Sequence, residues 1–366
     1  MRKTEHEIGI ISKPESNKKM DDNLKKRAEE IIAVCAKMQE EQLIARTWGN
    51  VSARISENSF LITPSGMSYD DMTLDDLVLV TVNSAHKTKT DSKADSSIKK
   101  PSSEKGMHAE IYGQRPECRF IIHTHQTNAS ALSILGEDLV LKDYMQEEYT
   151  GILGSVIPCA RYGLSSTKRL AKNVASAAKR NPDSKAVLMR YHGAVLMGHD
   201  AEEAMRAAIA LEDVCENIYR IRCGEQAYTR EDDTAEIESG GAEQNGRVIL
   251  IHTPFVMEMC RRGKTLYPYL DDMAQIGGTK ISCIDDMNEK HLRHSLKKNN
   301  AVLVRNTGAF CAAGSPDEAR AVATVLEKNC KAANLGLKKA VAPVPKLSAK
   351  LERTVYLKKY SRLKNK

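Results

Sequence analysis

The sequence predicts a mixed α/β protein, and three observations point to this fold class. Residues 23–43 carry apolar side chains at 28, 31, 32, 35 and 38, which is the spacing of an amphipathic helix. Short apolar runs bounded by turn residues, which are typical of strands, alternate with segments of helical spacing through residue 223. Part of this pattern then occurs a second time, which predicts a repeated structural unit.

The predicted elements follow one another in a simple order. After the first helix come a turn that leads into a strand (47–55), strands at 59–63 and 77–82, a helix at 104–114, a strand at 119–125, a helix at 128–135, two short strands within 185–196, and a helix that opens with a capping box at 200–203. Residues 86–100 are rich in Lys, Ser, Asp and Thr and predict an exposed loop. Ser102 or Ser103 is expected to cap the helix that follows this loop.

Composition places the chain among globular proteins. Its 366 residues are 41% hydrophobic and 28% charged, and no apolar run is long enough for a membrane span. Residues 1–17 lack the apolar core of a signal peptide, and nine scattered cysteines without a C-x-x-C pair indicate reduced, mostly buried thiols. We therefore expect a cytoplasmic protein with no membrane partner. One Trp, four Phe and no basic–aromatic alternation argue against a nucleic-acid partner.

Positive charge is concentrated at the C-terminal end. Residues 338–366 contain eight Lys and two Arg against one Glu, within a net charge of +7. Such a tail is expected to be solvated and partly disordered, and contact with an anionic partner is the alternative.

The second half of the chain repeats part of the first. Residues 186–219 align without a gap on residues 301–334, with 12 identities in 34 positions, and residues 248–253 resemble the apolar run 120–124. In this alignment the histidines of the first copy are matched as follows: His123 by His252, His125 by Pro254 and His192 by Thr307. Because one histidine does not make a metal site, the second copy is expected to be structural.

The apolar run 120–122 ends in His-Thr-His. Side chains two apart on a strand point to the same face, so His123 and His125 can hold one metal ion together. Alone, the pair is better explained by one histidine that caps the strand and another that faces solvent. Glu104 upstream and His192 at the end of another apolar run favour the metal site, because three histidines with a nearby carboxylate are typical of a catalytic zinc site with one open position.

Three turns rich in small and hydroxyl residues occur near these candidates, at 47–50, 63–66 and 102–103. Hydroxyl groups and exposed backbone N–H groups at a helix N-terminus suit a phosphate. Each turn alone has a sufficient explanation as a turn. All three beside a candidate zinc site favour a phosphorylated ligand, and no P-loop or dinucleotide-binding glycine motif competes with this interpretation.

Residues 22–223 resemble the class II aldolase/adducin family, in particular its L-fuculose-phosphate aldolase-like branch. The resemblance rests on five motifs in the same order: Gly-Asn-Val-Ser (49–52), Thr-Pro-Ser-Gly (63–66), Pro-Ser-Ser-Glu (101–104), Ile-His-Thr-His (122–125) and His-Gly (192–193). It implies a three-layer α/β/α fold around a central, mainly antiparallel sheet.

The resemblance also implies a role for each candidate residue. His123, His125 and His192 would bind one Zn²⁺, and Glu104 would transfer a proton and could ligate zinc when substrate is absent. Tyr144, 19 residues after His125, would act as a proton donor from a neighbouring subunit, and a half-buried interface tyrosine is an equal alternative. Contacts to the substrate phosphate would fall on Thr47, Gly49, Asn50, Ser65, Gly66, Ser102 and Ser103.

The implied activity is that of a zinc-dependent lyase, which cleaves a phosphorylated ketose reversibly to dihydroxyacetone phosphate and an aldehyde. Sugar-phosphate 4-epimerases of the family usually carry Asp in place of Glu104, which argues against that activity, and thio-sugar phosphate dehydratases are a further alternative. A non-catalytic, adducin-like assembly protein is the alternative of a different class. It is disfavoured because the first copy keeps all three metal ligands.

These patterns divide the chain into an N-terminal extension (1–21), a catalytic domain (22–223), a linker (224–246), a degenerate half-repeat (247–336) and a basic tail (337–366). The family usually forms cyclic tetramers, so a homo-oligomer is expected. The attached half-repeat could nevertheless occupy a surface where a neighbouring subunit would dock.

Overall fold

The computed structural model describes residues 22–44, 48–84, 99–224, 238–239 and 248–360. The chain divides into two compact units. Unit 1 comprises the residues up to Gln126 together with 137–189 and 193–212, and unit 2 comprises 127–136, 190–192 and the residues from Asp213 onward. The predicted extension (1–21), most of the loop 86–100 and most of the linker 224–246 lie outside the described residues.

Unit 1 is built around a seven-stranded sheet. Its strands lie in the order β3 (Val78–Thr81), β2 (Ser59–Ile62), β1 (Gly49–Ser56), β4 (Phe120–Thr124), β9 (Gly193–Gly198), β8 (Ala186–Met189) and β7 (Cys159–Ala160). Neighbouring strands are antiparallel except for β7 and β8, which are parallel. The predicted α/β class with a mainly antiparallel central sheet is confirmed.

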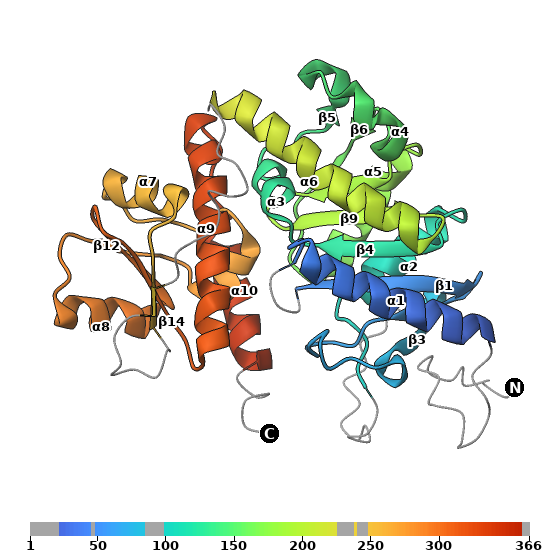
Figure 1. Ribbon diagram of the computed structural model, residues 1–366, viewed down its shortest axis with the longest axis horizontal. Coiled ribbons are helices and arrows are strands. Elements are labelled where there is room, and N and C mark those ends of the chain that lie inside the picture. Colours follow the sequence, from blue (N-terminus) through green and yellow to red (C-terminus); the bar gives the residue numbers. More distant parts are fainter. Residues whose placement is uncertain (1–21, 45–47, 85–98, 225–237, 240–247, 361–366) are drawn as a thin grey trace, which may run out of the picture. The chain divides into compact units, whose positions relative to one another are not determined.

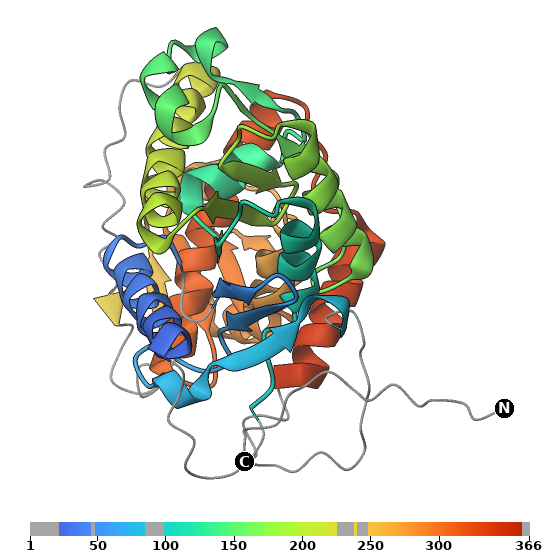
Figure 2. The same ribbon diagram turned by 90° about the vertical axis from the view of Figure 1, so that its right-hand side faces the viewer.

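Helices cover both faces of this sheet, which completes the three layers. Helices α2 (Lys105–Gln114) and α5 (Lys168–Arg180) lie on one face, and α1 (Asp22–Glu40) and the first half of α6 (Ala201–Cys223) lie on the other (Figure 1 and Figure 2). A large apolar cluster fills the space between the sheet and the α2–α5 layer. Because the sheet is covered on both faces, the ends of its strands are the places where polar side chains can gather.

Strand β1 presents two different faces. Val51 and Ala53 of β1 are fully buried and face α1, whose apolar spacing predicts a helix with one buried side. The alternate residues Asn50 and Ser52 are polar, equally buried, and point toward α2. A polar face on a buried strand requires internal hydrogen-bond partners, and the metal centre described below contains them.

Shorter elements complete the description. In unit 1, strands β5 (Leu139–Val140) and β6 (Val156–Ile157) form a two-stranded sheet near helix α4 (Thr150–Leu153). Helix α3 (Thr127–Ser133) belongs to unit 2. All nine cysteines are free and seven of them are buried, which confirms the prediction of mostly buried thiols. Among the described residues, no helix has both the length and the apolar character needed to span a membrane.

Unit 2 contains a five-stranded sheet that repeats the order of half of the first. The strands are β10 (Glu238–Ser239), β11 (Val248–Ile251), β14 (Gly308–Ala312), β13 (Ala301–Val304) and β12 (Cys283–Ile284), with helices α7 (Pro254–Arg262), α8 (Glu289–Lys298) and α9 (Pro316–Lys338). Strand β12 is parallel to β13 just as β7 is parallel to β8. The predicted half-repeat therefore has the strand order of the β4–β9–β8–β7 part of unit 1.

The strand register corrects one part of the predicted alignment. Thr124 pairs with Ala194 in the first copy, and Ile251 pairs with Ala309, the equivalent of Ala194, in the second. His252 therefore occupies the position of His125 and not that of His123. The sequence alignment was wrong because it matched the identical dipeptide His-Thr in the two copies. The register of β11 against β14 is instead decided by the backbone hydrogen bonds between these strands. In the second copy a histidine still occupies only one of the three positions that correspond to His123, His125 and His192.

Residues at equivalent positions of the two copies contact each other within unit 2. The Asn334 amide donates to the Tyr219 hydroxyl at 3.1 Å, and the Lys338 ammonium donates to the Cys223 carbonyl at 3.0 Å. Both pairs are 115 residues apart, which is the offset of the repeat. The C-terminal parts of α6 and α9 thus meet at equivalent points, as two-fold related elements do.

The basic tail differs from the expectation of a solvated, partly disordered end. Residues Lys346–Tyr360 form helix α10, and Ala349 and Glu352 are buried. Arg353 donates to the Gln275 and Ile276 carbonyls at 2.6 and 2.9 Å, where the π-helix Met273–Gly277 leaves these groups available. The expectation was wrong because net charge says nothing about one buried face of a helix.

Candidate metal centre

His123 is the penultimate residue of β4, and its ring is fully buried. Its Nδ1 lies 2.8 Å from the Ala194 carbonyl on the neighbouring strand β9. A carbonyl can only accept, so Nδ1 carries the proton and Nε2 is left as the nitrogen with a lone pair. On the other side, His123 pairs with Asn50 of β1, whose neighbour Gly49 approaches so closely that a Cβ there would lie 2.7 Å from the His123 carbonyl.

His125 follows the end of β4, where the chain turns into α3. Its ring is 8% exposed, and the Nε2 atoms of His125 and His123 are 3.1 Å apart. Gln126 anchors this corner, because its amide donates to the Ala208 carbonyl at 2.6 Å and accepts from the Thr124 hydroxyl at 2.8 Å. The predicted common face of the two histidines is confirmed by this geometry.

His192 lies in the turn between β8 and β9. The boundary between the units passes through this turn, although the flanking residues Met189 and Gly193 pair with each other in the sheet of unit 1. Gly193 is required here, since a Cβ at this position would clash with the Thr124 carbonyl of β4. Nδ1 of His192 donates to the Asp271 carboxylate at 2.6 Å, so in the neutral ring Nε2 carries the lone pair.

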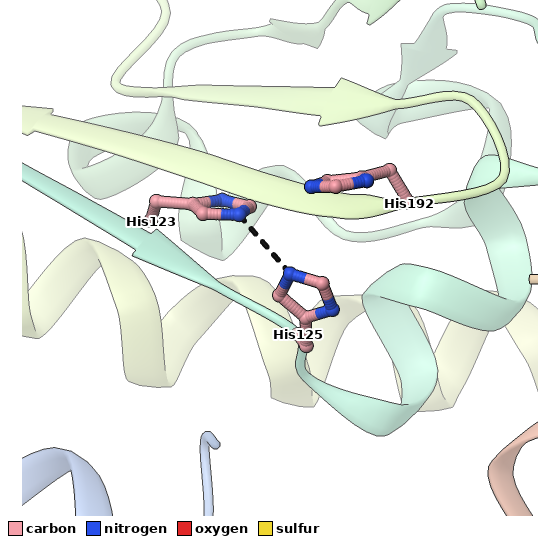
Figure 3. A group of neighbouring side chains, drawn as sticks. All are labelled: His123, His125 and His192. Carbon is pink, nitrogen blue, oxygen red and sulfur yellow. Dashed lines mark hydrogen bonds between the residues drawn. The ribbon is translucent and has the colours of Figure 1, made fainter. Parts of the chain in front are cut away.

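The three histidines form a group that could hold a metal ion (Figure 3). One ring nitrogen from each lies within 4.8 Å of the others, and all three side chains are buried. In a tetrahedral zinc site with Zn–N bonds of about 2.0–2.1 Å, neighbouring ligand atoms are about 3.3 Å apart. The 3.1 Å between the Nε2 atoms of His123 and His125 is close to this spacing.

Glu104 joins the group from the start of α2. Its Oε2 lies 3.1 Å from His123 Nε2, and its side chain is almost fully buried. The Asn50 amide donates to the same oxygen at 3.2 Å. A buried carboxylate beside three imidazoles completes the inventory that a metal-dependent proton-transfer site requires.

A chain of buried hydrogen bonds, which sequence reasoning missed, leads to this carboxylate. Nε2 of His108 donates to the Asn50 side-chain oxygen at 2.5 Å, and the Ser52 hydroxyl donates to His108 Nδ1 at 2.6 Å. Burial of His108, followed by the nearby His123, lowers its pKa to about 3, so this imidazole is neutral at ordinary pH. A neutral His108 fixes the orientation of Asn50 and thereby the donor that Asn50 offers to Glu104.

Two of the three predicted phosphate turns lie side by side. The Ser65 N–H donates to the Lys100 carbonyl at 2.8 Å, and the Ser102 N–H donates to the Thr63 carbonyl at 3.0 Å. This pairing brings Ser65 and Gly66 next to Ser102 and Ser103. The Ser102 hydroxyl accepts from the Glu104 N–H at 3.3 Å. The prediction that Ser102 or Ser103 caps this helix was wrong, because Glu104 occupies the N-cap position of α2 and no side chain makes a capping hydrogen bond there. Thr47 lies outside the described residues.

A cavity of about 280 Å³ adjoins the start of α2. Its lining includes Ser103, Glu104 and Lys105 from this corner, and Thr167 and Lys168 from the start of α5. Burial lowers the pKa of Lys105. The predicted proton-transfer residue and one predicted phosphate contact therefore share a cavity with two lysines.

Tyr144 lies at the end of the 3-10 helix Leu141–Tyr144 in unit 1 and is half-buried. It is not a member of the histidine group. Its role as a proton donor at the site of a neighbouring subunit stays a prediction.

The chain matches the family model of the class II aldolase and adducin N-terminal domain over residues 29–219 and 242–334. The chain belongs to the class II aldolase and adducin family. The second matched segment covers the half-repeat. Class II aldolases are metal-dependent lyases, and the predicted enzyme class is confirmed by this match and by an aldolase among the relatives.

Three similar proteins illustrate the range of this family. L-fuculose phosphate aldolase of Escherichia coli (strain K12) is 33% identical over 187 residues, which are 51% of this chain and 80% of that protein. Methylthioribulose-1-phosphate dehydratase of Yersinia enterocolitica is 32% identical over 188 residues, which are 50% of this chain and 86% of that protein. A solved structure of L-fuculose 1-phosphate aldolase has a TM-score of 0.46 and 28% identity, and the match covers 57% of this chain and 92% of that one.

Sequence reasoning missed Ser52, His108 and Asp271. Ser52 carried a usable signal, because it is two residues from Asn50 on a strand and must share its face. Asp271 had none, since it lies 79 residues from His192 in the chain.

Proposed function

We propose that this class II aldolase-family enzyme is a zinc-dependent lyase that cleaves a phosphorylated ketose reversibly to dihydroxyacetone phosphate and an aldehyde. The observation that carries the proposal is the convergence of His123, His125 and His192 beside Glu104, with 3.1 Å between Glu104 Oε2 and His123 Nε2. A site of this composition can hold a divalent ion and move a proton next to it.

The donor set fits zinc. Nδ1 of His123 donates to the Ala194 carbonyl, and Nδ1 of His192 donates to the Asp271 carboxylate. In the neutral form, each of these two rings therefore offers the lone pair of its Nε2 to a metal ion. Zinc accepts neutral imidazole nitrogen readily and leaves one position open when three protein ligands bind it. When bound, the ion supplies a positive charge that polarises a substrate carbonyl and stabilises negative charge next to it.

Glu104 is the proton-transfer residue in this proposal. Cleavage removes the proton of the C4 hydroxyl, breaks the C3–C4 bond and returns a proton to C3. In its protonated form Glu104 would deliver the proton to C3, and its position beside the three histidines and in the lining of the adjoining cavity supports this role. The hydrogen bond from Asn50 holds Oε2 of Glu104 in place. In the cleavage direction Tyr144 would accept the proton of the C4 hydroxyl, and in the reverse direction it would return that proton to the aldehyde oxygen.

The substrate phosphate would lie at the paired turns. Ser65, Gly66, Ser102 and Ser103 are adjacent through backbone hydrogen bonds, and Thr47, Gly49 and Asn50 complete the proposed contact set. Lys105 and Lys168 in the adjoining cavity add positive charge that favours an anionic substrate.

A dehydratase acting on a thio-sugar phosphate is a second candidate, because a relative of similar identity is named as one. Aldol cleavage begins with loss of the C4 hydroxyl proton, and dehydration begins with loss of a proton from a carbon next to the carbonyl. In both reactions a bound metal would polarise that carbonyl. They differ in the bond that breaks next, which is C–C in the aldolase and C–O in the dehydratase.

A panel of ketose 1-phosphates and aldose phosphates tests the proposal. Purified, zinc-loaded protein should release dihydroxyacetone phosphate from at least one ketose 1-phosphate. Loss of water without dihydroxyacetone phosphate would identify a dehydratase. Zinc binding without turnover of any compound would favour an adducin-like assembly protein.

We further propose that the enzyme is a cytoplasmic homo-oligomer in which Tyr144 reaches the site of a neighbouring subunit. Sedimentation velocity measures the assembly. Mixing His125→Ala and Tyr144→Phe subunits tests the sharing of sites, since a shared site recovers part of the activity that each variant lacks alone.

A further inference from the structure

The turn that carries His192 has an unusual backbone. Tyr191 has φ = 64°, in the left-handed region, and its side chain is buried. This conformation is unfavourable for a bulky residue, so surrounding contacts must hold it. The Tyr191 carbonyl accepts from the Asp271 N–H at 2.9 Å, and the Tyr191 hydroxyl donates to the Ala342 carbonyl at 3.0 Å.

Asp271 makes a second contact with the same turn. Its carboxylate Oδ2 accepts from His192 Nδ1 at 2.6 Å, and its side chain is fully buried. One residue thus holds both the backbone of the turn and the ring of the predicted metal ligand. A histidine whose Nδ1 proton is held by a carboxylate presents Nε2 outward with a fixed ring orientation and greater basicity.

The segment that carries Asp271 is held in turn by α9. The Asn329 side-chain oxygen accepts from the Tyr269 and Leu270 N–H groups at 2.7 and 3.2 Å. Lys328 and Asp272 form a buried ion pair. All of these contacts, and those of the His192 turn, lie within unit 2.

These supporting residues belong to the second copy alone. The positions of α6 that correspond to Lys328 and Asn329, 115 residues earlier, are Asp213 and Val214. Val214 has no side-chain acceptor, and Asp213 would repel a carboxylate. The half-repeat therefore differs from its parent at the residues that fix Asp271.

We propose that Asp271, supplied by the half-repeat, is a positioning residue of the metal centre: it selects the tautomer of His192 and aims its Nε2 at the ion. The half-repeat has lost the ligands for a metal of its own and instead supports a ligand of the first copy. This inference rests on the metal site of the proposed function.

Zinc affinity of the full chain is the first test. In competition with a chelator of known affinity, Asp271→Ala should bind Zn²⁺ 10- to 100-fold more weakly than wild type, the usual cost of removing such a partner. Asp271→Asn, which keeps an acceptor oxygen, should fall between the two. Asp286→Asn, an exposed carboxylate of the same half-repeat, should bind like wild type. Wild-type zinc affinity in Asp271→Ala would overturn the inference.

The tautomer of His192 is the second test and separates positioning from general support of the fold. In metal-free, ¹⁵N-histidine-labelled protein, His192 should carry its proton on Nδ1 in wild type and shift toward Nε2–H in Asp271→Ala. An unchanged tautomer would overturn the inference even if zinc affinity fell. Neither measurement requires turnover, so the proposed reaction can fail while Asp271 retains this role.

Discussion

The carboxylate of Glu104 lies 3.1 Å from Nε2 of His123, the nitrogen that His123 offers once its Nδ1 is held by the Ala194 carbonyl. Glu104 is the N-cap residue of helix α2 and His123 is the penultimate residue of strand β4, so this pair joins two layers of the fold at the proposed reaction site. An acid–base group and a metal ligand in direct contact allow proton transfer next to a polarised substrate.

Glu104→Gln should retain zinc and lose turnover by about 10²- to 10⁴-fold, because the amide keeps the shape of the side chain but cannot carry a proton. Steady-state kinetics and metal analysis of the same preparation measure both quantities. Glu57→Gln, an exposed change in the β1–β2 turn, should leave both unchanged. Full turnover in Glu104→Gln would remove this residue from the mechanism.

His125→Ala and His252→Ala form a matched pair, because the two histidines occupy equivalent positions after β4 and β11. His125→Ala removes a metal ligand itself. It should therefore weaken zinc binding by more than the roughly 100-fold loss that follows removal of a residue that only supports a ligand. His252→Ala, at an exposed position, should bind zinc as wild type does. Equal zinc content of the two variants after dialysis against a weak chelator would contradict the site assignment.

Acid should destabilise the fold through His108. Its pKa is about 3 in the folded chain and 6.5 for an ordinary histidine, so the unfolded state binds a proton in the interval between these values while the folded state does not. This contribution to the free energy of unfolding is complete above pH 6.5 and declines by on the order of 1 kcal/mol per pH unit as the pH falls toward 3.

Urea denaturation of wild type and His108→Asn from pH 7.5 to 4 measures this slope. The variant should be less stable at pH 7.5 because it disrupts the chain of hydrogen bonds to Asn50, and it should lose less stability on acidification. Parallel pH profiles would contradict the prediction.

Gly193→Ala should destabilise unit 1 by about 1–3 kcal/mol, the usual cost of overpacking, because the new methyl group would meet the Thr124 carbonyl of a central strand. Gly113→Ala in α2 is the control, since a methyl group there meets no atom within 4 Å and should stabilise the helix by about 0.5–1 kcal/mol. Chemical denaturation distinguishes the two, and equal midpoints would show that β9 can move away from β4.

Most of the candidate site was predictable because its signals are local. The alternation of a strand places His123 and His125 on one face, and the same rule places Asn50 and Ser52 together. The motif order connected these residues to Glu104 and His192 through the family resemblance. The repeat was visible as a constant offset between aligned residues, and the sequence alone showed that most of the metal-binding histidines are replaced in the second copy.

The tertiary structure decided what depends on residues far apart in the chain. Backbone pairing of β11 with β14 showed that His252 replaces His125, where letter matching indicated His123. The net charge of the tail gave no indication of helix α10. Its residue Arg353 donates a hydrogen bond to a carbonyl group 77 residues earlier in the chain. The contact of Asp271 with His192 has no local signature at all. A partner 79 residues away is selected by packing and hydrogen-bond geometry, and neither leaves a periodic pattern in the sequence.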